Sequence, residues 1–147
     1  PCTSLFKPIW LDGEPNLFGP LPAGTFDRES MFWRHELLHR SILKDYSRRL
    51  AAYSEERDVI EQSWIKQVED LSGSDSNART EFSRLCFREA EALRQKWLQM
   101  INALPIQRTP AIYYRLAWKK IDQEAKIPPG AWNDMAYDPI SQDDMIR

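Results

Sequence analysis

The run SMFWRHELLHRSILKDYSRRLAAYSEERDVIEQSWIKQVEDL, residues 30–71, decides the fold because it contains neither proline nor glycine. Along it, apolar side chains recur at alternating steps of three and four that Arg57 and Gln67 interrupt, at Leu43, Tyr46, Leu50, Tyr53, Ile60, Trp64 and Leu71. This heptad-like spacing predicts one continuous helix of roughly 40 residues, about 60 Å long at 1.5 Å per residue. A helix of that length needs a partner for its apolar stripe.

The partner is expected directly downstream. Residues 72–77, SGSDSN, are rich in turn formers. A second helix is expected at 78–103, with an apolar face made of Phe82, Cys86, Ala90, Leu93, Trp97, Met100 and Leu104. Because a short polar connection places neighbouring helices antiparallel, we predict a long helical hairpin.

The rest of the chain divides around this hairpin. Thr109 and Pro110 look like a cap and a first-turn proline that open a third helix to about residue 126. Its apolar side is formed by Tyr114, Ala117, Trp118, Ile121 and Ala125. We expect a mainly α fold in three parts: an extended strand and Pro/Gly-rich loop at 1–29, the hairpin with the third helix at 30–127, and an irregular tail at 128–147.

Composition narrows the class of protein. The chain has 147 residues, 42% of them hydrophobic, and six tryptophans, which favours a folded domain with a substantial packed interior. A net charge of -2 argues against a general field for nucleic acid or anionic lipid. The basic row Arg40, Lys44 and Arg48 has the spacing of a solvated helix face.

The termini and cysteines bear on location. No apolar run approaches the roughly 20 residues that span a bilayer, and the start Pro1–Cys2 has no basic region typical of a signal peptide. The missing Met suggests a processed or excised piece. Two cysteines, Cys2 and Cys86, are too few for a disulfide framework, although one bridge between them stays open. We therefore expect a cytoplasmic protein.

A metal-binding pattern lies near the start of the first helix. His35-Glu36-Leu37-Leu38-His39 matches H-E-x-x-H, in which two histidines on one helix face bind zinc and the glutamate activates a water. Catalytic zinc needs a third protein ligand, and both histidines of the chain are already used. A carboxylate would have to supply it.

No carboxylate is expected in the right place. Glu55 and Glu56 would lie about 24 Å or more along the same continuous helix from His39. The hairpin would place the acids of the second helix, Glu81, Glu89 and Glu91, opposite the later half of the first helix. We therefore favour a structural origin for the motif, a half-buried His and Glu held by hydrogen bonds, and predict no catalytic, cofactor-binding or metal-binding residue and no cofactor.

Two sequence blocks carry a family resemblance. TSLFKP at 3–8, followed by a Pro/Gly-rich spacer with LFGP, and then MFWRHELLHRSILKDYSRRL at 31–50, resemble the C-terminal part of the secernins and related dipeptidases. The matching residues are Ser4, Phe6, Lys7 and Pro8 in the first block, and Arg34, His35, Glu36 and Leu37 in the second. The resemblance extends over about residues 1–70 and is weak beyond them.

The resemblance implies a parent enzyme of the N-terminal-nucleophile class, an α/β sandwich whose terminal cysteine cleaves dipeptides, with its own amine as the base. In that family the nucleophile lies far upstream of the F-K-P strand, so Cys2 does not match it. Whether the chain is itself an enzyme is therefore left open.

We expect the C-terminal helical portion or a subunit of a secernin-like cysteine dipeptidase, with a structural or subunit-pairing role and no catalysis alone. Its partners would be the parent catalytic domain or a second subunit, with possible homo-oligomers through the hairpin, and neither nucleic acid nor membrane. The alternatives are an independent helical interaction module and, third, a zinc metallopeptidase using His35, Glu36 and His39.

Overall fold

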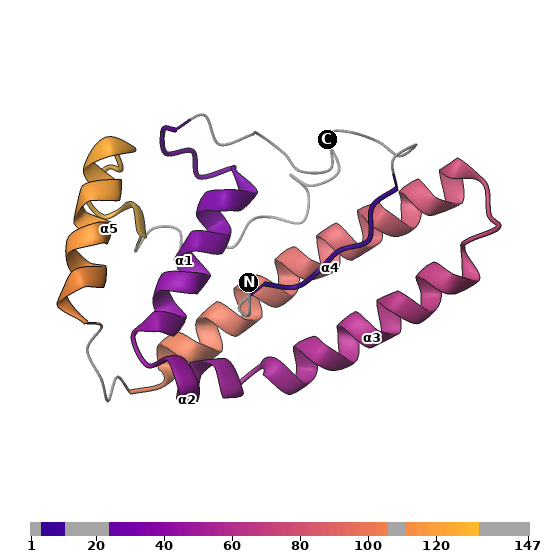
Figure 1. Cartoon of the computed structure of the whole chain (residues 1–147), viewed down its shortest axis with the longest axis horizontal. Helices are drawn as coiled ribbons and strands as arrows, with labels where there is room; N and C mark the ends of the chain where they lie inside the picture. The colour runs from indigo at the N-terminus through magenta and orange to yellow at the C-terminus, as the bar shows by residue number, and fades with distance from the viewer. Residues whose placement is uncertain (1–3, 11–23, 106–110, 133–147) are drawn as a thin grey trace.

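The computed structural model describes residues 4–10, 24–105 and 111–132, and within them the chain is mainly α-helical (Figure 1). Five helices follow one another: α1 (Met31–Leu43), α2 (Tyr46–Ala51), α3 (Ser54–Asp70), α4 (Ser76–Ala103) and α5 (Ile112–Glu124). No strand occurs among these residues. The predicted mainly α fold class is confirmed.

The single helix predicted for residues 30–71 is wrong, because the chain breaks between α1 and α2 and again between α2 and α3. Neither break contains proline or glycine, so the cause lies in tertiary contacts. Arg49 is 2% exposed and donates from Nη1 to the Ser41 carbonyl, 2.6 Å away, which the end of α1 leaves without a helical partner. At the second break Tyr53 is buried and stacks on Trp97 of α4, with ring centroids 4.5 Å apart. Packing therefore overrides the helical tendency of the run.

The breaks alter how the apolar stripe is used. Of the seven positions in the predicted stripe only Tyr53 and Trp64 are buried, and Tyr46 is exposed. In α1 a different set packs inward, Trp33, Leu37, Leu38 and Ile42. The prediction was one continuous apolar face, and the bent chain does not have such a face.

The helical hairpin itself is confirmed, and α3 and α4 run antiparallel (Figure 1). The Trp97 indole N–H donates to Glu56 across 2.8 Å near the start of α3, and the Trp64 indole N–H donates to Glu89 across 3.2 Å closer to the turn. At the turn, Asp75 caps α4 by accepting from the backbone N–H of Ala78.

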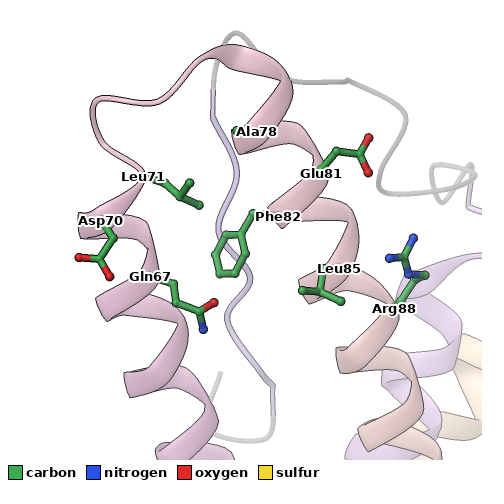
Figure 2. Close-up of a pocket in the computed structure, with 8 residues that line it drawn as sticks. All are labelled: Gln67, Asp70, Leu71, Ala78, Glu81, Phe82, Leu85 and Arg88. Carbon is green, nitrogen blue, oxygen red and sulfur yellow. The ribbon is translucent and has the colours of Figure 1, made fainter.

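Residues 4–10 lie between α3 and α4 as extended chain (Figures 1 and 2). The backbone N–H of Phe6 donates to Glu61 of α3 at 2.8 Å, and Ser83 of α4 donates its hydroxyl to the Pro8 carbonyl at 2.9 Å. Leu5 is 6% exposed and belongs to the hydrophobic core. The expected strand is thus an extended segment bonded to the two helices of the hairpin.

The core lies where α1 and the N-terminal segment meet α4. The predicted apolar face of α4 is confirmed, since four of its seven members, Phe82, Cys86, Ala90 and Trp97, are buried and the others are partly buried. Cys86 is a free thiol whose pKa burial raises to about 12, so it stays protonated. Cys2, the other cysteine of the disulfide that the sequence analysis left undecided, lies outside the described residues.

The third helix is present as α5, which begins at Ile112, while Thr109 and Pro110 lie outside the described residues. Its predicted apolar side packs less than expected. Among those positions only Ala125, just after the helix, is buried, and no residue within Ile112–Glu124 is. The chain then turns at Lys126, which has the left-handed conformation with φ 56°. A left-handed residue commonly follows the end of a helix, and the third helix was predicted to end at about this residue.

Candidate functional site

The H-E-x-x-H residues lie on α1, and the carboxylate of Glu36 is already occupied. Its Oε1 accepts from Arg40 Nε at 2.8 Å, and its Oε2 lies 3.2 Å from Nδ1 of His39. In a zinc enzyme the glutamate must keep an oxygen free for the metal-bound water. Here both oxygens of Glu36 serve the helix itself.

The electrostatics around the two histidines agree with this arrangement. Burial would raise the pKa of Glu36, but the hydrogen bonds from His39 and Arg40 outweigh it and the pKa is lowered. Burial, with the nearby charges of His39 and Lys7, lowers the pKa of His35 to about 4. His35 is therefore a neutral imidazole at neutral pH.

The acids considered as a third ligand form other contacts. Glu56 accepts from Lys96 and Trp97, Glu89 accepts from Trp64, and Glu91 pairs with Arg94. Glu81 pairs with Arg84, and Glu55 is exposed on α3. Within 4–10, 24–105 and 111–132, no three His, Cys, Asp or Glu side chains are grouped so as to hold a metal ion.

Instead, α1 is joined to the end of the described chain by a group that we name the Arg40 cluster: Arg40, Glu36, Asp122, Trp118 and Trp132. Arg40 Nη1 donates to Asp122 at 2.7 Å, 82 residues away in sequence. The guanidinium carbon lies 4.5 Å from the centre of the Trp132 ring and 5.5 Å from that of Trp118. Two carboxylates and two indoles thus hold the guanidinium of Arg40, a residue that is 7% exposed.

A pocket of about 750 Å³ lies beside this cluster, between α1, α5 and residues 127–132. We call it the basic pocket, because its lining includes Arg40, Lys44, Arg115, Lys119 and Lys126. A solvated helix face was predicted for the row Arg40, Lys44 and Arg48. That prediction is wrong for Arg40, which is buried. Sequence reasoning missed the cations of α5, although Arg115 and Lys119 have the same i,i+4 spacing that drew attention to α1.

A second pocket, of about 580 Å³, lies between α3 and α4 near their turn (Figure 2). It is lined by Gln67, Asp70, Leu71, Ala78, Glu81, Phe82, Leu85 and Arg88. Its charged groups are of mixed sign and stand at the rim around Phe82 and Leu85. The described residues of the lining include no imidazole, thiol or hydroxyl that could act as a nucleophile or base.

The two blocks that carry the family resemblance meet in space. Lys7 Nζ donates to the Leu5 carbonyl at 2.9 Å and stands 5.5 Å from the centre of the Phe87 ring. Burial lowers the pKa of Lys7, opposed by the charge of Glu91, and Glu91 also lies 3.5 Å from Arg34 of the second block. Lys7 is thus a partly buried charge with backbone and aromatic contacts.

Comparison of the chain with protein-family models, with curated proteins and with solved structures gave no match. None of the helices in the described part of the chain is long and apolar enough to span a membrane.

Proposed function

We propose that this chain is the C-terminal helical portion, or a separate subunit, of a secernin-like cysteine dipeptidase in the cytoplasm. Its role is to brace the catalytic domain or to pair subunits, and it does not catalyse on its own. The family assignment depends on the two sequence blocks at 3–8 and 31–50. The cytoplasmic location depends on the low cysteine content.

The observation that carries the pairing role is the apolar surface of α5. Ile112, Tyr113 and Leu116 are 71%, 62% and 62% exposed, and α5 buries no side chain along its length. Exposed apolar side chains that lie together favour contact with another polypeptide. Phe6 and Ile9 of the N-terminal segment are also exposed, which adds a second apolar surface.

Sedimentation velocity tests pairing between copies of the chain. We expect concentration-dependent association that Leu116→Glu abolishes. The matched control is Val59→Glu, which adds the same charge at an exposed apolar residue of α3. A wild-type chain that stays monomeric, and that also fails to co-purify with the polypeptide encoded upstream of Pro1, would show that the pairing role is wrong.

The same upstream sequence separates this proposal from an independent helical interaction module. We expect it to encode a Cys-led catalytic region, and its absence would favour the independent module. If the chain were a zinc metallopeptidase, the isolated chain would instead bind about one zinc. It would also hydrolyse dipeptides, and this activity would disappear in His35→Ala.

A further inference from the structure

The basic pocket holds far more positive than negative charge. Five cationic side chains line it, and among the described residues the lining contains a single carboxylate, Asp122. That carboxylate already accepts from Arg40 at 2.7 Å. Within the described residues none of the other four cations, Lys44, Arg115, Lys119 and Lys126, forms an ion pair. The chain as a whole carries a net charge of -2, so this concentration of positive charge is local.

Buried donors beside the pocket also lack acceptors. Nη2 of Arg40 and Nε1 of Trp132 are buried and have no hydrogen-bond partner among the described residues. Leaving such donors unsatisfied costs free energy, and the cost is larger for a charged group. Within the described part of the chain, donors and positive charge at this pocket therefore exceed what the acceptors there use.

Lys44 adds to this imbalance. It lies one turn after Arg40, at the C-cap of α1, and burial together with the charge of Arg49 lowers its pKa. A negative group in the pocket would reverse that effect, because it favours the charged ammonium.

We propose that the basic pocket binds a small polyphosphate anion, either free or as the headgroup of a phosphorylated lipid. Four unpaired cations match several negative charges better than one carboxylate. Phosphate oxygens also accept hydrogen bonds from both ammonium and guanidinium groups. Arg40, fixed by Glu36, Asp122 and the two indoles, contributes a permanent charge at one wall of the pocket. The site does not depend on the proposed pairing role.

Isothermal titration of the purified chain with sodium tripolyphosphate tests the site. The pocket variant is the double substitution Arg115→Gln and Lys119→Gln, at two exposed positions of α5 that line the pocket. The matched control is Lys120→Gln with Lys66→Gln, which removes the same charge from exposed positions outside the lining. Circular dichroism verifies that all three proteins are folded.

We expect one tripolyphosphate per chain, bound more tightly than about 1 mM at low salt and more weakly as salt rises. The pocket variant should lose about tenfold or more in affinity, while the control stays within about twofold of wild type. Wild-type chain that does not bind, or equal losses in the two variants, would overturn the proposal. The second result would mean general attraction of an anion to a cationic surface.

Co-sedimentation with phosphatidylcholine vesicles, with and without a phosphoinositide, distinguishes the two sources of the phosphate. Binding that requires the phosphoinositide and is lost in the pocket variant identifies a lipid headgroup. Tripolyphosphate binding without any vesicle binding identifies a soluble ligand.

Discussion

Replacing Arg40 by methionine should detach α5 from α1. The substitution keeps an unbranched apolar stem but removes the 2.8 Å bond to Glu36, the 2.7 Å bond to Asp122 and the cation that lies 4.5 Å from the Trp132 ring. Because α5 buries no side chain of its own, these contacts carry much of its attachment.

The size of the stability loss expected for Arg40→Met follows from how exposed Glu36 and Asp122 are. Breaking a fully buried ion pair costs about 3–5 kcal/mol. The Asp122 side chain is 33% exposed and that of Glu36 17%, so water replaces part of the lost interaction. Methionine also recovers part of the contact with the indoles. We therefore expect a loss of about 2–3 kcal/mol, which for a chain of this length lowers the melting temperature by roughly 5–10 °C.

Hydrogen–deuterium exchange measures where the loss occurs. Amides of α5 should exchange at least about tenfold faster in Arg40→Met, since about 1.4 kcal/mol of local stability corresponds to that factor. Amides of α4 should change less. The control is Arg115→Met on α5, an exposed arginine whose loss should cost less than about 0.5 kcal/mol. If α5 exchanges in Arg40→Met as it does in wild type, the Arg40 cluster does not hold this helix.

Three further predictions concern the core, the hairpin and acid stability. Leu5→Ala should cost about 2–3 kcal/mol in urea unfolding and Phe6→Ala less than about 0.5, because Leu5 is 6% exposed and Phe6 71%. Glu56→Ala should cost about 1–2 kcal/mol by the same assay, because it leaves the buried Trp97 indole N–H without its acceptor. Between pH 6.5 and 4 the unfolded chain binds a proton at His35 that the folded chain does not. Stability should therefore fall on acidification by up to about 3 kcal/mol, and unfolding curves of His35→Gln should lack this component.

Local patterns in the sequence were sufficient for the helices and the hairpin, but not for the bends. The spacing of apolar residues in α4 and the turn formers before it are local signals, and both led to the correct element. The bends on either side of α2 have no such signal. They depend on Arg49 reaching the Ser41 carbonyl and on Tyr53 stacking on Trp97, contacts that exist only once the chain has folded.

In the candidate site, too, local sequence patterns could be recognised, whereas contacts between distant residues could not. The i,i+4 pair Glu36 and Arg40 is visible in the sequence, but the structural origin of the motif was inferred from the lack of a carboxylate placed to be a third ligand. Asp122, the other acid that binds Arg40, lies 82 residues away, and nothing in its local sequence indicates that contact. The basic pocket was missed for this reason: its cations lie on or just after α1 and α5, two helices far apart in sequence that the bond from Arg40 to Asp122 joins.

The spacing that makes H-E-x-x-H suitable for zinc also places its glutamate beside other residues of the same helix. Two histidines four residues apart share a helix face, and a glutamate between them equally shares a face with the residues three and four positions later. In this chain those residues are His39 and Arg40, and they take the two oxygens of Glu36. A glutamate held in this way orients an arginine, which in turn binds Asp122 of α5. A metallopeptidase assignment from this motif therefore requires two observations beyond the pattern itself, a third ligand and a glutamate whose carboxylate is not already bound by its own helix.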